Sequence, residues 1–114
     1  MDNCLFCRII KGEIPSAKVY EDEYVYAFND INPAAPVHVL VVPKVHIDSL
    51  EGINEENIEN VIHIHKAIKK VAKITGINEA GYRVIVNSGE GAGQTVLHLH
   101  YHVLGGVKMG EKIL

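Results

Sequence analysis

Three histidines occupy alternate positions near the end of the chain, His98, His100 and His102, within the stretch TVLHLHYHVLGG. Successive side chains of an extended strand point to opposite faces of a sheet, so this spacing places the three imidazoles on one face, about 6 to 7 Å apart. The other face carries the apolar residues of the same stretch, which we expect to form the core side: Leu99, Tyr101 and Val103. The histidine face is therefore expected to be the side available to a ligand.

A row of imidazoles can divide the work of a reaction, because one ring attacks while its neighbours bind the substrate or fix the tautomer of the attacking ring. An imidazole is half neutral near its unperturbed pKa of about 6.5, so the middle ring, His100, is suited to attack phosphorus at pH 7. Two other interpretations are a solvated polar strand face and a metal site. A carbonic-anhydrase-like zinc site needs three nitrogens at about 2.0 Å from one atom, and a nearly straight strand holds them too far apart.

A glycine-rich segment, NSGEGAGQT, leads directly into the histidine stretch. Its glycines, Gly89, Gly91 and Gly93, allow backbone amides to approach an anion closely. The segment is not a Walker A loop, because no Lys-Ser or Lys-Thr pair follows it and the next expected element is a strand. Such a hairpin is often only a turn, but its position beside three histidines favours phosphate as the bound anion.

The composition is that of a globular protein and argues against several classes of partner. The chain has 114 residues, of which 47% are hydrophobic and 22% charged, and this predicts one domain spanning residues 1–114. A net charge of -3 supplies no basic stripe for a nucleic acid polymer. The sequence contains no secretory signal pattern and no apolar run of membrane-spanning length, so we expect a cytoplasmic protein without a membrane segment.

Both cysteines lie in one Cys-x-x-Cys motif, Cys4 and Cys7. A reducing compartment disfavours a structural disulfide between them. From the residues alone, they are free thiols, a redox pair or metal ligands. A thioredoxin-like redox role is the weaker of these interpretations, because the motif does not follow a strand.

Hydrophobic periodicity predicts the elements that position these residues. Apolar residues recur every three or four positions from Asn54 to Thr75, which predicts one long helix with Asn54 as N-cap and Gly76 after its end. A short helix is expected within residues 4–11, and strands are expected at 18–20, 24–29, 37–43, 80–88 and 96–104. The strand at 37–43 is so apolar that both of its faces should be covered. About five strands with one long helix inserted predict an antiparallel sheet with that helix on one face, an α+β fold.

The stretch HLHYHVL, residues 98–104, matches the His-φ-His-φ-His-φ-φ signature of the histidine triad (HIT) superfamily. The longer stretch GAGQTVLHLHYHVLGG resembles the Hint branch of that superfamily, the nucleotide-binding purine nucleoside phosphoramidases. The resemblance extends over residues 6–47 and over GYRVIVNSGEG, which is most of the chain. It implies a HIT-like fold and a reaction in which the middle histidine, here His100, attacks the α-phosphorus. The covalent nucleotidyl-histidine that results is then hydrolysed by water.

The same resemblance implies roles for other residues around the phosphate. His102 would bind the phosphate, and His38 would assist, including in proton transfer. Thr95, together with Gly93 and Gln94, would contact the phosphate or the leaving group. Asn87 would lie beside the phosphate site. From the residues alone, His38 is equally a packed histidine within an apolar strand.

For the nucleoside, the resemblance implies that Asp30 holds the ribose hydroxyls. It also implies an apolar slot for the base, formed by Phe6, Ile9, Phe28 and Ile31. Without the resemblance, Asp30 is a turn residue before Asn32-Pro33, and the four apolar residues are core. His63 and His65, on the predicted long helix, match no family position and are expected at the surface or an interface.

Some bacterial-type relatives in this superfamily bind zinc through a Cys-x-x-Cys motif and two histidines. Here the matching residues are Cys4, Cys7, His46 in PKVH and His98. Two cysteines and two histidines suit a closed, tetrahedral and therefore structural zinc ion, which would pin the N-terminal segment to the catalytic strand. The alternative is a pair of thiols with no metal.

The resemblance thus implies a homodimeric hydrolase or nucleotidyl transferase for purine nucleoside phosphoramidates or related phosphoesters, needing no cofactor for catalysis. The two subunits would join through the long helix and a neighbouring strand. Two alternatives are a Fhit-like dinucleoside polyphosphate hydrolase and a non-catalytic nucleotide-binding adaptor. The sequence departs from the animal Hint pattern after GGVKMGEKIL and contains no tryptophan, so the resemblance does not imply the leaving-group selectivity that depends on a longer C-terminal tail. Asn29, where those relatives carry histidine, is a smaller departure near the expected base site.

Overall fold

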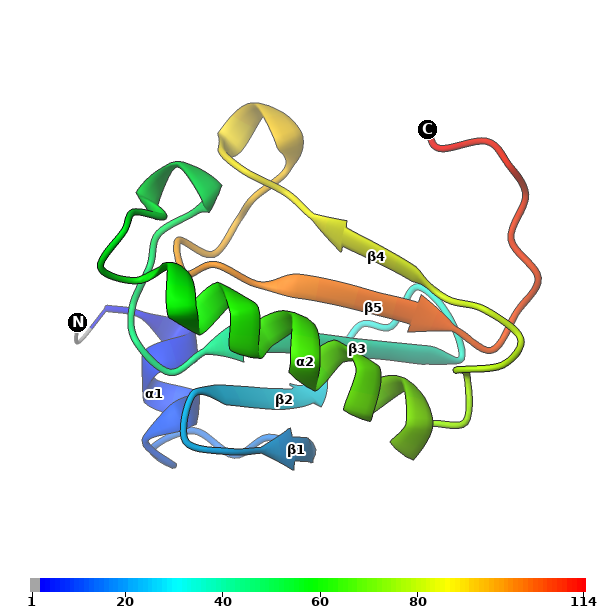
Figure 1. The fold of residues 1–114 in the computed structure, drawn as a ribbon, viewed down its shortest axis with the longest axis horizontal. Helices are drawn as coiled ribbons and strands as arrows, with labels where there is room; N and C mark the ends of the chain where they lie inside the picture. Colours follow the sequence, from blue (N-terminus) through cyan, green and yellow to red (C-terminus); the bar gives the residue numbers. More distant parts are fainter. Residues whose placement is uncertain (1–2) are drawn as a thin grey trace.

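The computed structural model describes residues 3–114 and confirms the α+β prediction (Figure 1). Two α-helices and five strands follow one another within these residues: α1 (Leu5–Ile10), β1 (Lys18–Glu21), β2 (Val25–Asn29), β3 (Val37–Pro43), α2 (Ile58–Ile74), β4 (Arg83–Val86) and β5 (Tyr101–Gly105). Single 3-10 turns, Leu50–Gly52 and Glu90–Ala92, lie in the connections before α2 and β5. No helix in the described part of the chain is long and apolar enough to span a membrane.

The strands form one antiparallel sheet in the order β1-β2-β3-β5-β4. β3 and β5 are neighbours near the centre of the sheet, although α2 and β4 separate them in the sequence (Figure 1). Their register pairs Leu40 with His102 and His38 with Leu104. Paired residues point to the same face of a sheet, so His38 and His102 share a face as diagonal neighbours.

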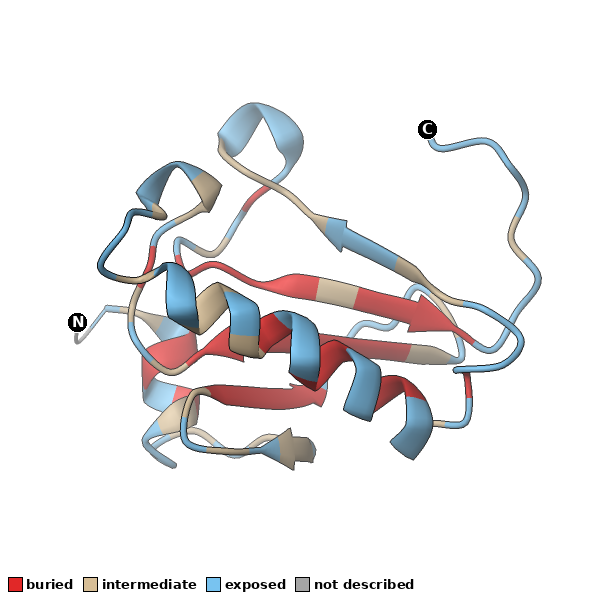
Figure 2. Cartoon of the chain, in the orientation of Figure 1, coloured by how far each residue is buried: buried red, intermediate tan, exposed pale blue. Residues whose placement is uncertain are grey.

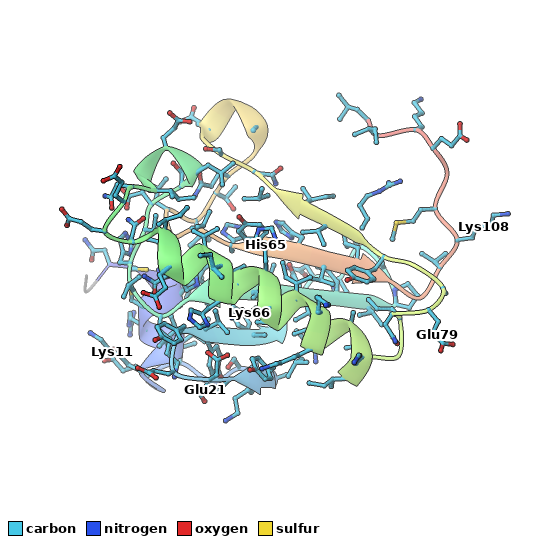
Figure 3. All side chains as sticks on the ribbon, viewed as in Figure 1. Lys11, Glu21, His65, Lys66, Glu79 and Lys108 are labelled. Carbon is cyan, nitrogen blue, oxygen red and sulfur yellow. The ribbon has the colours of Figure 1, made fainter. Side chains whose placement is uncertain are left out.

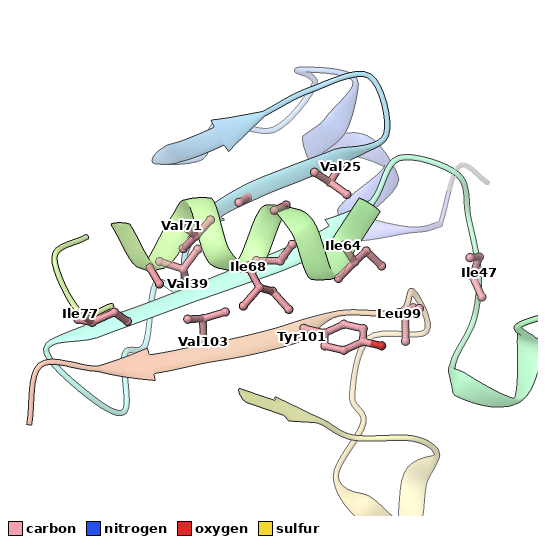
Figure 4. Packing of buried hydrophobic residues seen from close by; sticks show 14 residues of the cluster. Val25, Val39, Ile47, Ile64, Ile68, Val71, Ile77, Leu99, Tyr101 and Val103 are labelled. Carbon is pink, nitrogen blue, oxygen red and sulfur yellow. The ribbon is translucent and has the colours of Figure 1, made fainter. Parts of the chain in front are cut away.

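One face of the sheet packs against α2 and forms the main core. Alternate residues of the central strands, such as Val25, Val39 and Val103, point toward Ile64 and Val71 of the helix (Figure 4). The expectation that one side of the histidine stretch is the core side is confirmed, because three residues are almost completely buried in this cluster: Leu99, Tyr101 and Val103.

The opposite face of the sheet is partly covered by α1. Phe6 and Ile9 of this short helix pack on residues of β2 and β3 that alternate with those of the main core: Tyr26, Phe28, Leu40 and Val42. β3 is therefore buried on both faces, as its continuous apolar sequence predicts (Figure 2). The histidine face is thus not simply the open side of the sheet, because a second helix lies over part of it.

The long helix begins later than predicted, at Ile58 instead of Asn54. The Asn54 side chain does accept backbone N–H bonds, from Glu56 at 2.9 Å and from Asn57 at 3.1 Å, but these close a turn that precedes the helix. The predicted end is close to the observed one, with Thr75 as C-cap. Gly76, at φ 77°, follows it, in the left-handed conformation that glycine adopts readily.

The last two strands are shorter than predicted, and for β5 the cause is Pro43. The predicted strand at 80–88 is β4, Arg83–Val86, and the predicted strand at 96–104 is β5, Tyr101–Gly105. The β3–β5 register runs from Val37↔Gly105 to Val41↔Tyr101, so its continuation would reach Pro43. Proline has no backbone N–H to donate, and the Pro43 carbonyl instead lies 2.8 Å from His98 Nε2. His98 and His100 therefore precede the paired part of the strand.

Gly105 in β5 lies against Ile77, which follows α2: a Cβ atom at position 105 would lie 2.8 Å from Ile77 Cδ1 and 3.1 Å from its Cβ. We predict that Gly105→Ala lowers the free energy of unfolding by about 1–3 kcal/mol, because the added methyl group overpacks this contact. Chemical denaturation measures the change. Gly110→Ala is the control, since a Cβ there would meet nothing within 4 Å. Equal stability of the two variants would contradict the prediction.

Candidate active site and metal centre

Helix α1 covers part of the histidine face. His98 is completely buried, His100 is 7% exposed and His102 is partly buried. The Phe6 ring of α1 packs edge-on against His100, with ring centroids 5.1 Å apart, and against His98 at 6.0 Å. The histidine face is opposite the core face, as expected, but the short helix places an aromatic side chain over its first two rings.

His100 is held by the backbone of its own strand. Its Nδ1 atom lies 2.8 Å from the His98 carbonyl oxygen, two residues earlier in the chain. A carbonyl oxygen only accepts hydrogen bonds, so Nδ1 carries the proton of the neutral ring and Nε2 keeps its lone pair. The His100 and His102 rings are neighbours, with centroids 5.1 Å apart.

His102 is supported from β3 and from the loop that follows β2. His38 Nε2 lies 2.9 Å from His102 Nδ1 and 3.4 Å from the Asp30 carboxylate. Burial, followed by the neighbouring rings of His100 and His38, lowers the pKa of His102 to about 4. At pH 7 His102 is therefore neutral, so its ring can donate a hydrogen bond but carries no charge for an ion pair.

The predicted metal ligands come together at the N-terminal end of α1. Cys4 Sγ lies 3.2 Å from His98 Nδ1, and Cys7 Sγ lies 3.4 Å from Nδ1 of both His98 and His46. The four ligand atoms all lie within 4.8 Å of one another. Burial and the neighbouring Cys4 raise the pKa of Cys7 to about 11, so this thiol needs a cation beside it to ionise at pH 7.

Both histidines of this cluster present the correct nitrogen to a metal. His98 Nε2 lies 2.8 Å from the Pro43 carbonyl, and His46 Nε2 lies 2.6 Å from the Asp48 carboxylate. Each Nε2 therefore carries the ring proton and donates it, which leaves each Nδ1 as a lone pair directed at the thiols. Two thiols and two such imidazoles are a donor set that fits a tetrahedral metal ion.

The glycine-rich loop is shaped by Gln94. The buried Gln94 side chain accepts from the Gly89 amide at 2.8 Å and donates to the Asp48 and Val96 carbonyls at 2.7 and 3.0 Å. The amides of Gly93 and Gln94 also bond within the loop, to the carbonyls of Glu90 and Gly89. These two residues therefore set the conformation of the loop. Thr95 is exposed and lines a cavity of about 820 Å³ that reaches to Cys4 and His46.

The structure brings together most, but not all, of the residues expected around a nucleoside. Phe6 and Phe28 pack edge-to-face, with ring centroids 5.5 Å apart, and Ile9 lies in the same cluster. Ile31, in contrast, is 91% exposed and stands apart from this cluster. One carboxylate oxygen of Asp30 accepts a hydrogen bond from the Asn32 amide at 2.8 Å. This oxygen therefore stabilises the turn, as the residues alone predict.

The two histidines of α2 lie away from the triad face, and Asn87 lies near the glycine-rich loop. His65 lies on the flank of α2 next to β5 (Figure 3), where its side chain is exposed and its ring contacts Tyr101. His63 stacks on Tyr24 with ring centroids 3.6 Å apart, so neither histidine belongs to the triad face. Asn87 is partly buried just after β4, at the start of the glycine-rich loop.

Sequence reasoning missed several groups that act on the histidines. The carbonyls of Pro43 and His98 and the amide of Ala34 are backbone groups, and the identity of a residue carries no signal for them. Asp48 was detectable, because a carboxylate two residues after a ligand histidine can accept its second N–H.

Comparisons with known proteins identify the family of the chain. The family model of the HIT domain matches residues 11–109. A structure described as a HIT family hydrolase from Clostridium thermocellum matches with a TM-score of 0.98 and 62% sequence identity, covering 100% of this chain and 99% of that chain. The 14 kDa zinc-binding protein of Zea mays is 50% identical, covering 92% of this chain and 83% of its own. The purine nucleoside phosphoramidase of Escherichia coli (strain K12) is 39% identical, covering 98% and 94%.

The family match includes the glycine-rich loop, the three alternate histidines, and both His38 and His46. The length of the family match and the near-complete overlap with the Clostridium thermocellum structure confirm the resemblance seen in the sequence. The chain belongs to the HIT domain family.

Proposed function

We propose that the protein hydrolyses purine nucleoside phosphoramidates or related nucleotide phosphoesters, with His100 as the nucleophile. The observation that carries this proposal is the 2.8 Å hydrogen bond from His100 Nδ1 to the His98 carbonyl. It leaves Nε2 of the neutral ring unprotonated and able to attack phosphorus.

The reaction consists of two displacements at the α-phosphorus. In the first, Nε2 of His100 bonds to phosphorus while the bond to the leaving amine breaks, and the amine takes up a proton from the solvent. In the second, water attacks phosphorus and releases a proton to the solvent, the bond to Nε2 breaks, and a nucleoside monophosphate leaves. Between these steps the ring is cationic, so its hydrogen bond to the His98 carbonyl becomes charge-assisted. A bond that strengthens as the charge develops lowers the barrier and does not merely bind substrate.

The remaining site residues have roles that match their positions. Neutral His102 and the exposed Thr95 contact the phosphoryl oxygens and the leaving group, with Asn87 beside them. The partly buried Asp30 keeps one oxygen outside its turn and binds the ribose. The base lies against the aromatic cluster of Phe6 and Phe28. The purine nucleoside phosphoramidase among the relatives supports this substrate class.

Two other functions would use the same nucleotide site. A dinucleoside polyphosphate hydrolase needs the same nucleophile, and a comparison of rates with phosphoramidates, dinucleotides and sugar nucleotides distinguishes the two enzymes. A non-catalytic adaptor needs only the pocket. The orientation of the His100 ring favours catalysis, because binding alone needs no lone pair held between two other histidines.

We predict that the protein releases AMP from an adenosine phosphoramidate and that His100→Ala lowers kcat/KM about a thousandfold or more, because the covalent route is lost. Product release measured by chromatography tests this prediction. His65→Ala is the matched control, since this histidine lies on the opposite face of the sheet and should leave turnover unchanged. Undiminished turnover in His100→Ala would remove that residue from its proposed role.

We infer further that the metal centre holds zinc. The set of Cys4, Cys7, His46 and His98 matches the ligands that zinc prefers, and a zinc-binding relative supports the choice. Four protein ligands leave no open position, so the ion supplies a structural link and no catalytic water. That link joins α1 to the backbone that leads into β5.

Metal analysis of protein purified without chelator should find zinc in the wild type and in His100→Ala. It should find little in the Cys4→Ser, Cys7→Ser double variant, because a hydroxyl is a much poorer zinc ligand than a thiolate. Equal zinc in the double variant would count against the thiols as ligands.

The dimer implied by the family also has a candidate surface. Ile58 and Ile62 on one flank of α2 are 44% and 51% exposed, and Val61 lies beside them. Val84 of the neighbouring edge strand β4 is 39% exposed and points to the same side of the sheet as α2. An apolar helix flank next to an open strand edge is suited to pairing with a second copy of the chain.

We predict that Ile62→Glu converts the homodimer to monomer, because the interface would bury an unpaired charge. Sedimentation velocity measures the change. Ile74→Glu is the control, as this isoleucine is also exposed on α2, at 57%, but lies on the opposite flank. A wild-type protein that sediments as a monomer at high concentration would contradict the proposed dimer.

A further inference from the structure

A second group of close donor atoms lies in the active site. Ligand atoms of Asp30, His38 and His102 all lie within 4.8 Å of one another. Such a group suits either a metal ion or a chain of hydrogen bonds, and the two alternatives need different tautomers of His38. The residue that decides between them is Ala34, in the loop between β2 and β3.

The Ala34 backbone amide donates to His38 Nδ1 at 2.9 Å. An amide N–H cannot accept a hydrogen bond and does not titrate, so Nδ1 of His38 must present its lone pair. A neutral imidazole carries one proton, and in the buried His38 ring this proton is therefore on Nε2. The Asp30 carboxylate, 3.4 Å from Nε2, favours the same position.

This assignment continues to His102. His38 Nε2–H donates to His102 Nδ1 at 2.9 Å, so the proton of neutral His102 is on Nε2. Among the described residues, His102 Nε2 has no hydrogen-bond partner, and no buried side-chain nitrogen is left unsatisfied. Nε2–H of His102 therefore reaches solvent, where a substrate would contact it.

The same reasoning separates this group from the cysteine-containing one. A metal on Nε2 of His38 would require a proton on Nδ1, where the Ala34 N–H already points. In His46 and His98 the situation is reversed, since each Nε2–H donates to an oxygen and Nδ1 is free for a metal. Backbone and second-sphere groups thus assign His46 and His98 to a metal and His38 to a hydrogen-bond chain.

We propose that the Ala34 amide and His38 are positioning groups that fix His102 as a hydrogen-bond donor to a phosphoryl oxygen of the substrate. This rests on the proposed function, in which His102 contacts the phosphate. His38 then passes no proton during the reaction, because its Nδ1 is occupied by a group that cannot accept one. The expectation that His38 assists by proton transfer is replaced by a role in orientation.

Substitutions at position 38 distinguish the two roles. Glutamine retains the pattern, because its oxygen can accept from Ala34 and its nitrogen can donate to His102, but it cannot titrate. His38→Gln should bind AMP within a few-fold of wild type and keep most of the turnover. His38→Leu should lose tenfold or more in AMP affinity, because His102 is then free to place its proton on Nδ1. Equal loss of turnover in the two variants, with AMP affinity intact in the glutamine variant, would overturn the proposal in favour of proton transfer.

The tautomers can be measured directly on the full-length protein with labelled histidine. Ring nitrogen NMR spectra of the wild type at pH 7 should show His38 and His102 protonated at Nε2 and His100 protonated at Nδ1. His102 protonated at Nδ1 would overturn the proposal, whatever the turnover. This measurement does not depend on activity, so it tests the proposed tautomers separately from the proposed function.

Removal of a single N–H group provides a further test. Ala34→Pro should shift the proton of His38 or His102 toward Nδ1 and weaken AMP binding about tenfold or more, with the His100 spectrum unchanged. Ala35→Pro, one residue further on, is the matched control and should change neither. If Ala34→Pro folds and keeps the wild-type spectrum, the amide does not fix the tautomer. If it does not fold, the wild-type spectrum and the variants at position 38 decide.

Discussion

A neutral imidazole has two nitrogens and one proton, and this site depends on where that proton lies. Four of the seven histidines, His38, His46, His98 and His100, have one ring nitrogen bonded to a group whose hydrogen-bonding role is fixed. Three of these groups belong to the backbone and the fourth is the Asp48 carboxylate. Each therefore determines whether the opposite nitrogen carries the proton or a lone pair, as the roles proposed for the four rings require.

The fold supplies these backbone groups because a strand pairing stops early. Pro43 cannot extend the ladder between β3 and β5, so its carbonyl becomes available to His98. Leu99 donates its amide to the Ile47 carbonyl instead, which holds the segment close to the sheet but outside the ladder. The His98 carbonyl can then accept from His100. One proline thus orients both His98 of the candidate metal site and, through it, His100, the proposed nucleophile.

Much of this arrangement could be predicted from the sequence. The alternation of the three histidines correctly predicted that the residues between them lie in the core. The spacing of apolar residues from Asn54 to Thr75 predicted the start of α2 to within four residues. The position of α1 over the histidine face followed only from the family resemblance, because a six-residue segment by itself gives no indication of which side of a sheet it covers. The role of the Ala34 amide was also hidden, since every residue except proline has the same N–H group. Such contacts follow from strand register, which only the folded chain defines.

Helix α1, together with its N-cap Cys4, carries both thiols and an aromatic ring that covers two histidines. Cys4 and Cys7 belong to the group of four residues proposed to bind zinc, and Phe6 between them covers both His98 and His100. If zinc binds as proposed, damage to the thiols, by oxidation or by an electrophile, would disturb the Phe6 side chain that covers His100 as well as the ligand group. The Cys-x-x-Cys segment is thus a point of chemical vulnerability for the proposed nucleophile, which lies almost a hundred residues later in the sequence.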